Sequence, residues 1–168
     1  MKKLLLFFAI VCFATFQLTA KIKPTQLTCE YLENPSVVDV LHPRLSWINI
    51  TDEGERGQKQ TAWQIRVASS KENLENPDLW DSKKVESNQS TRIEYDGQPL
   101  LSRQDCWWQV RVWDKNGEVS GWSDPAFWHM GLLSESDWQA TWIGAPWQGE
   151  ETLQKPMNPN APLPEELP

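Results

Sequence analysis

The chain has 168 residues, of which 16 are basic and 23 acidic, so its formal net charge is −7. This length allows one domain with extensions, and the negative charge argues against nucleic acid or an anionic membrane surface as a partner. Tryptophan is unusually frequent, with 11 residues against 2 tyrosines, so the division of these rings between core and surface bears on function.

Residues 1–20 have the pattern of a secretory signal peptide. The segment begins with two lysines, continues through an almost entirely apolar run, Leu4 to Phe16, and ends in the small pair Thr19-Ala20. This run is too short to cross a bilayer, and no later stretch is apolar enough to do so. We therefore expect an exported protein, in the periplasm or outside the cell, without a membrane span.

In the first half of the remaining chain, apolar and polar residues alternate with the period of a β-strand. The expected strands are residues 21–32, with Leu27, Cys29 and Tyr31 on one face, then Arg44–Ile48 and Thr61–Ser69. The segment Lys71–Asp78 allows a helical turn, and the lysine-rich pair Lys84-Val85 is typical of a short edge strand.

The strongest strand signal lies near residue 110. Trp108, Val110 and Val112 alternate with Gln109, Arg111 and Trp113, which gives the strand an apolar face. The turn residues Asp114–Gly117 follow, and a last strand is expected through Ala126–Trp128. With a further alternation at Ile93 and Tyr95, about seven short strands fall within roughly 110 residues, without a long helical pattern. The sequence predicts an all-β, immunoglobulin-like or fibronectin type III-like antiparallel β-sandwich over residues 21–131.

The pattern changes after Gly131. Residues 132–147 are expected to be a transition toward a following domain, in which Asp137–Gly144 could form one more strand. Residues 148–168 are rich in proline and glutamate, and proline at this density resists helix and sheet. We expect a linker or disordered tail there, and hence a further domain beyond it.

No constellation for catalysis is evident. His42 precedes a proline in a loop and His129 falls in the last strand, and both are expected to be ordinary residues. The adjacent carboxylates Glu150-Glu151 and Glu165-Glu166 fall in the linker, which does not suit the facing pair of a glycosidase. No metal-binding or phosphate-binding motif occurs. We expect no catalytic residue, no cofactor and no metal site.

Three tryptophans on the apolar faces of predicted strands, Trp47, Trp63 and Trp108, are expected in the core. Export would permit a disulfide between Cys29 and Cys106, but two cysteines are too few to indicate a disulfide framework. We favour two small buried thiols.

Other tryptophans are expected outside the core. Arg111, Trp113 and Trp122 could form a cation–π stack on the outer face of the sheet. A second group lies where the sandwich passes into the linker, where rings could dock onto a neighbouring domain or stack on a sugar. This second group comprises Trp138, Trp142 and Trp147.

The pattern resembles a fibronectin type III domain. The resemblance is carried by Trp47, Trp63-x-Ile65-x-Val67, Trp108-x-Val110-x-Val112 and Gly121-Trp122-Ser123. Trp108 stands where that family usually has a tyrosine, which puts the family's tyrosine-corner hydrogen bond in doubt.

The chain is more closely similar to the N-terminal module of bacterial α-L-rhamnosidases, over about residues 24–147. One departure is Lys83, where a glycine is common. The similar segments are Pro43–Trp47, Gln60–Ala68, Leu79–Ser82, Trp108–Asp114, Trp122-Ser123, Gly131–Leu133 and Asp137–Ile143.

This resemblance implies a large exported inverting hydrolase that removes terminal L-rhamnose from plant glycans and glycosides. The family's catalytic acids lie in a later helical barrel, which nothing in this chain matches, so no catalytic residue is carried over. The implied role is a non-catalytic scaffold or docking module whose partners are the missing downstream domains of the same enzyme, with plant polysaccharide as a further candidate partner. The alternatives are a freestanding carbohydrate-binding module and a protein-interaction module of the fibronectin type III class.

Overall fold

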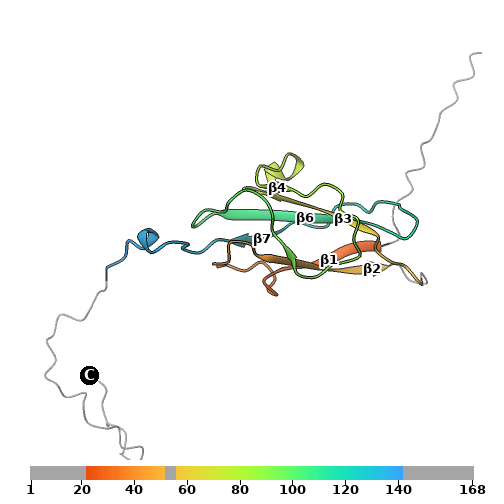
Figure 1. Cartoon of the computed structure of the whole chain (residues 1–168), viewed down its shortest axis with the longest axis horizontal. Helices are drawn as coiled ribbons and strands as arrows, with labels where there is room; N and C mark the ends of the chain where they lie inside the picture. Colours follow the sequence, from red (N-terminus) through yellow and green to blue (C-terminus); the bar gives the residue numbers. More distant parts are fainter. Residues whose placement is uncertain (1–21, 52–55, 142–168) are drawn as a thin grey trace, which may run out of the picture. The chain divides into compact units, whose positions relative to one another are not determined.

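The computed structural model describes residues 22–51 and 56–141. The predicted signal peptide and the proline-rich linker lie outside the described residues. Seven strands form two antiparallel sheets that pack face to face (Figure 1), which confirms the predicted fold class. No helix in the described part is long and apolar enough to cross a membrane.

The smaller sheet has the order β1-β2-β5 and the larger sheet the order β4-β3-β6-β7. Two short 3₁₀ turns, η1 and η2, complete the described elements. The bounds are β1 Ile22–Cys29, β2 Arg44–Thr51, β3 Ala62–Ala68, η1 Glu72–Glu75, β4 Trp80–Asp81, β5 Ile93–Glu94, β6 Asp105–Trp113, β7 Ala126–His129 and η2 Glu135–Asp137.

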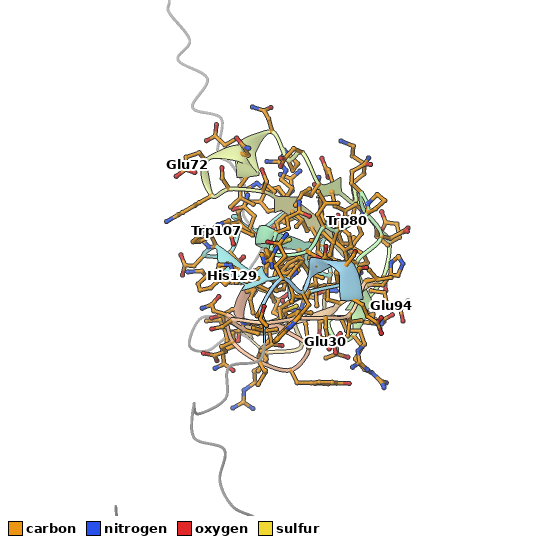
Figure 2. The ribbon with its side chains drawn as sticks, turned by 90° about the vertical axis from the view of Figure 1, so that its left-hand side faces the viewer. Glu30, Glu72, Trp80, Glu94, Trp107 and His129 are labelled. Carbon is orange, nitrogen blue, oxygen red and sulfur yellow. The ribbon has the colours of Figure 1, made fainter. Side chains whose placement is uncertain are left out.

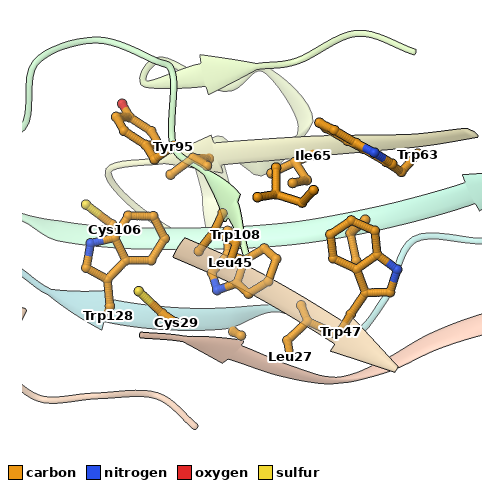
Figure 3. Close-up of a cluster of buried hydrophobic side chains, with 14 of the residues drawn as sticks. Leu27, Cys29, Leu45, Trp47, Trp63, Ile65, Tyr95, Cys106, Trp108 and Trp128 are labelled. Carbon is orange, nitrogen blue, oxygen red and sulfur yellow. The ribbon is translucent and has the colours of Figure 1, made fainter. Parts of the chain in front are cut away.

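The core lies between the two sheets and is dominated by tryptophan (Figure 3). Trp47 from β2 and Trp108 from β6 are at most 1% exposed, and Trp63 from β3 is 7% exposed, so all three predicted core rings are confirmed. Trp128 from β7 is also fully buried, although its place was not predicted. Trp47 and Trp63 meet edge to face with centroids 6.1 Å apart, a favourable aromatic geometry.

Both cysteines of the sandwich are free and buried. Cys29 lies on β1 and Cys106 on β6, and both side chains are among the core residues (Figure 3). Burial raises the pKa of each thiol to about 12. The thiols therefore stay protonated at neutral pH and pack as small apolar groups, as favoured from the sequence.

The hydrogen bonds of Trp108 and Tyr95 bear on the tyrosine corner. The indole N–H of Trp108 is buried without a partner among the described residues. Tyr95, which directly follows β5, donates its hydroxyl to the carbonyl of Gln98 at 2.7 Å, and burial raises its pKa. The backbone bond is thus made by a tyrosine that follows β5, and Trp108 on β6 makes no equivalent bond among the described residues.

The first strand is shorter than the predicted residues 21–32, and Tyr31 does not continue the alternation of Leu27 and Cys29. A bulge between Thr25 and Thr28, with Gln26 at a φ of 48°, shifts the alternation of β1. The strand ends at Cys29, and Tyr31 has a φ of 68° and is 63% exposed. Its ring lies over the guanidinium of Arg44, 5.0 Å from Cζ to the ring centroid.

The predicted edge strand Lys84-Val85 is reduced to a single antiparallel bridge, between Val85 and Trp63 of β3. The edge strand is β4, because Trp80 pairs with Val67 of β3 and its ring packs on Tyr95 with centroids 5.4 Å apart. Lys83 then turns the chain with a φ of 56°, a conformation that glycine adopts at less cost.

After β7 the chain remains attached to the sandwich. In place of the predicted strand over Asp137–Gly144, the described part has the turn η2, and residues 138–141 form no strand. The side chain of Ser134 caps η2 through a capping box with Asp137. Ser102 donates its hydroxyl to the Asp137 carboxylate and accepts from the backbone N–H of Leu133 at 2.9 Å. The compact unit accordingly extends to Trp138.

Candidate functional site

The outer face of the larger sheet carries a row of cations and tryptophan rings. On β6, Arg111 and Trp113 are half-buried and alternate with the fully buried Val110 and Val112. The Arg111 Cζ atom lies 5.3 Å from the Trp113 ring centroid and 4.6 Å from the Trp122 ring centroid. The structure therefore brings together the three residues that the sequence analysis grouped.

Two further cations extend this row. Arg66 of β3 lies with Cζ 4.4 Å from the Trp122 centroid, and Lys84 lies with Nζ 5.1 Å from the Trp113 centroid. The outward position of Arg66 in its strand is a usable sequence signal. Lys84 has no such signal, because it follows the left-handed turn at Lys83. We call Lys84, Trp113, Arg111, Trp122 and Arg66 the cation–tryptophan row.

Gln64 of β3 fixes the middle of the row. Its side-chain oxygen accepts hydrogen bonds from Arg111 Nε at 2.9 Å and Nη2 at 2.7 Å, and its amide nitrogen donates to Asp81 at 2.6 Å. Burial lowers the pKa of Arg111, and the charge of Arg66 lowers it further. Burial alone would raise the pKa of Asp81, but hydrogen bonds from Lys83 and Gln64 hold it below its usual range.

Two serines place Trp122 in the row. The Ser120 and Ser123 hydroxyls accept from the backbone N–H groups of Val112 at 3.0 Å and Val110 at 3.1 Å. The backbone N–H groups of the same serines donate to the carbonyls of these two valines, each at 2.8 Å. The two serines thus supply hydrogen-bond partners for the backbone of Val110 and Val112, although the segment that carries the serines is not a regular strand. Trp122, which lies between the serines in sequence, reaches the outer face of the sheet.

A cavity of about 500 Å³ adjoins the Arg66 end of the row. Arg66 and Gln109 are register partners on β3 and β6, and η1 contributes side chains from another direction. The cavity combines four separate segments, so no local sequence motif could have predicted it. Its lining is Arg66, Lys71, Leu74, Glu75, Gln109, Trp122 and Pro125.

A second aromatic group lies on the same face toward β7 (Figure 2). Phe127 has its ring centroid 5.2 Å from that of Trp107 and 5.2 Å from that of His129. His129 Nδ1 contacts the carboxylate of Asp105, its register partner on β6. These half-buried rings cover the sheet beyond the cation–tryptophan row.

Apolar side chains are exposed where the chain leaves β7. Val37 is 69% exposed, Leu101 67% and Trp138 59%. Val37 lies beside Gly131, and Arg103, two residues after Leu101, donates to the Asp137 carbonyl at 2.8 Å. We call Val37, Leu101 and Trp138 the exit patch. The other two rings of the predicted docking group, Trp142 and Trp147, lie outside the described residues.

The described residues offer little catalytic chemistry. His42 is engaged through Nδ1 with the Tyr95 carbonyl at 2.9 Å. Within residues 22–51 and 56–141, no group of three histidine, cysteine, aspartate or glutamate side chains could hold a metal ion. The described surface carries instead a cationic aromatic face and an exposed apolar patch.

Comparisons with known proteins identify the domain type. Residues 24–134 match a family model described as the Rha78A-like, N-terminal immunoglobulin domain. An α-L-rhamnosidase of Streptomyces avermitilis is 45% identical over 125 residues, which cover 74% of this chain and 12% of the relative. An α-L-rhamnosidase of Alteromonas sp. (strain LOR) is 40% identical over 140 residues, 82% of this chain and 15% of the relative.

Solved structures agree with this match. The crystal structure of the Streptomyces avermitilis α-L-rhamnosidase complexed with L-rhamnose superposes with a TM-score of 0.71, covering 74% of this chain and 12% of that one. The α-L-rhamnosidase from Dictyoglumus thermophilum gives a TM-score of 0.67 at 36% identity, covering 72% of this chain and 14% of that one. The chain thus spans only 12% to 15% of the length of these curated relatives.

Proposed function

The chain belongs to the family of Rha78A-like N-terminal immunoglobulin domains, and from this membership we propose that it serves as the scaffold and docking module of an exported α-L-rhamnosidase acting on plant glycans. The match is to the N-terminal domain of the relatives and not to their catalytic domain. In those relatives the domain is part of a much larger enzyme.

The observation that carries the docking role is the exit patch. Val37, Leu101 and Trp138 are each more than half exposed, and each lies on a segment that meets the chain after β7, through the contact of Val37 with Gly131 and the bond from Arg103 to Asp137. Exposed apolar groups that gather in this way usually mark an interaction surface. The occupant we propose is the next domain of the same polypeptide, since it is held near this end of the sandwich by the chain itself.

The encoding DNA beyond the codon of Pro168 gives a direct test. We expect the reading frame to continue into a second β domain and a helical barrel. A stop codon at that point, followed by an unrelated gene, would favour the freestanding binding or interaction module instead.

Docking can be tested in the chain extended through that frame. The triple variant V37S/L101S/W138S should lower the melting temperature of the extended protein, because it removes apolar area from a domain interface. The matched control is I48S, since Ile48 is 52% exposed on the outward face of β2. An extended protein in which the triple variant behaves like I48S would rule out docking through the patch.

The chain as given should not hydrolyse aryl α-L-rhamnosides. The chain matches the N-terminal immunoglobulin domain of its relatives, 12% to 15% of their length, and not their catalytic domain. Purified chain would be assayed for release of the aryl group. Robust turnover that disappears on substitution of one acidic residue between Pro24 and Thr141 would contradict the non-catalytic role.

Export and the plant-glycan target are further parts of the proposal. Export is supported by the signal-peptide pattern of residues 1–20, and is tested by finding the mature N-terminus close after Ala20 in protein recovered from the periplasm or medium. The glycan target is supported by family membership. Release of L-rhamnose from plant glycans by the extended protein would test it.

A further inference from the structure

We propose that the cavity beside Arg66 binds the carboxylate of an acidic sugar residue. The assignment of a carboxylate comes from the charges and hydrogen-bonding groups of the cavity. The assignment of a sugar rests on the proposed function in a glycan-degrading enzyme. The site lies on the outer face of the larger sheet and does not involve the exit patch.

Arg66 supplies a cation without a carboxylate partner. No ion pair to its guanidinium occurs among the described residues. Its register partner on β4, Asp81, is engaged by Lys83 Nζ at 2.8 Å and by Gln64. The Nε of Arg66 is also buried without a hydrogen-bond partner in the described structure. A carboxylate on the terminal nitrogens would supply the charge-assisted bonds that arginine forms best.

Gln109 is a second unpartnered polar group in the same cavity. Its side chain lines the cavity, and the residue is only 9% exposed. Its amide makes no hydrogen bond to any other residue that the structure describes. The amide atoms of Gln109 are not among the fully buried atoms without a partner, so this side chain, beside Arg66 in the register, is open to a ligand hydroxyl or carboxylate in the cavity.

Charge and shape favour one acidic sugar. Arg66 and Lys71 carry positive charge against the single carboxylate of Glu75, so the lining has a net charge that one carboxylate neutralises. The volume of about 500 Å³ falls in the usual range of ligand pockets. Leu74 and Pro125 add apolar surface for the C–H groups of a sugar ring.

A neutral sugar fits this surface less well. Neutral sugars usually bind by stacking on an open aromatic face, whereas the Trp122 ring already contacts two guanidinium groups, at 4.4 and 4.6 Å. A ligand at this end of the row therefore meets the guanidinium of Arg66 as well as the ring. This arrangement selects for negative charge.

The test is a titration of the full chain with D-galacturonate, with D-galactose as the uncharged matched sugar and acetate as the carboxylate alone. The readouts are the indole N–H signal of Trp122 and the side-chain amide signals of Gln109 in proton–nitrogen correlation spectra. We expect saturable shifts with galacturonate, no shifts with galactose, and much weaker binding of acetate. The Trp138 signal should not move.

Variants locate the site. R66Q should weaken galacturonate binding by about tenfold or more, because it removes the charge-assisted bonds. K71A, on the exposed turn η1, should weaken it about twofold to fivefold. The matched control is K115A, which removes an exposed cation from the turn after β6, outside the row and the cavity, and should leave binding unchanged. A melting curve for each variant shows whether it is folded.

Four results would overturn the proposal. They are the absence of saturable shifts, equal shifts with galactose, acetate binding as tight as galacturonate, and unchanged affinity in both R66Q and K71A. If R66Q does not fold, the affinity of K71A and the comparison with galactose and acetate still test the proposal. Because none of these four results depends on Val37, Leu101 or Trp138, failure here leaves the docking proposal to its own test.

Discussion

At Gly97 the chain passes very close to the segment around Leu79 and Trp80. A Cβ atom added there would lie 2.5 Å from the Leu79 carbonyl oxygen, 2.5 Å from the Tyr95 hydroxyl and 2.6 Å from the Trp80 Cβ. These are the groups that join β4 to the segment after β5. Only glycine fits at this position without moving its neighbours. The hydrogen bond from the Tyr95 hydroxyl to the Gln98 carbonyl depends on this close approach.

We predict that G97A lowers the free energy of unfolding by about 1–3 kcal/mol, because the new methyl group forces backbone and ring apart. The matched control is G121A, since a Cβ at Gly121 meets nothing within 4 Å. Urea unfolding of both variants measures the difference. Equal stabilities for the two variants would show that the crossing at Gly97 can relax at no cost.

The buried tryptophans should dominate stability at the residue scale. Trp47 and Trp108 are at most 1% exposed, so W47A or W108A should cost about 3–5 kcal/mol and unfold a marginal domain. The same change at the exposed Trp138 should cost less than about 0.5 kcal/mol. Thermal melts monitored by circular dichroism compare them. A W108A variant that melts like the parent would show that the ring is not part of the core.

At the scale of elements, the end of β1 is joined to the start of β2 by a charge pair. One oxygen of Glu30 accepts from the backbone N–H of Arg44 at 2.6 Å and from its Nε at 3.1 Å. These bonds lower the pKa of Glu30, although its partial burial opposes them. Because the carboxylate has a lower pKa in the folded chain, it stabilises the fold above the ordinary glutamate pKa. This contribution is lost as the pH falls through the folded value.

E30Q should therefore lower the melting temperature at pH 7, and its difference from the parent should shrink as the pH approaches 3. The comparison variant is E33Q, which changes an exposed glutamate in the following loop. Melting temperatures measured across this range decide the matter. A deficit in E30Q that stays constant with pH would mean that charge has no part in the effect.

Strand alternation predicted the elements whose packing follows a strict period of two. β6 is the best case, since Trp108, Val110 and Val112 are all fully buried as expected. The end of β1 was predicted incorrectly, because Glu30 and Tyr31 adopt positive φ angles that end the strand at Cys29. The position of β4 was also not predicted, because it depends on the contact between Trp80 and Tyr95. Contacts between distant segments leave no periodic signal.

The same distinction applies to the candidate site. Arg111 and Trp113 could be grouped from the sequence because they share one face of a single strand. The cavity beside Arg66 could not be predicted from the sequence, because η1 and the segment around Trp122 come together only in the fold. Glu72 of η1 and Glu30 of the smaller sheet lie on opposite sides of the body (Figure 2), so η1 borders the outer face of the larger sheet. A short turn with no periodic pattern gives no sign of this position.

At the scale of the whole molecule, the two proposed binding surfaces have different chemistry. The cation–tryptophan row and its cavity are polar and positively charged, although the whole chain has a net charge of −7. The exit patch is apolar and lies where the chain leaves the sandwich. Such a division allows a domain to join its own polypeptide through one surface while another surface remains open to a soluble ligand.

The exit patch makes a prediction about tryptophan fluorescence in the chain by itself. Trp138 is 59% exposed, so iodide should quench it, and W138F should reduce the quenchable fraction of the total emission. W63F is the control, because Trp63 is 7% exposed and its loss should leave that fraction almost unchanged. In the chain extended through its following domain, the contribution of Trp138 should become protected. If W138F leaves the quenchable fraction unchanged in the chain alone, the ring is already covered, and the apolar surface on which docking depends does not exist.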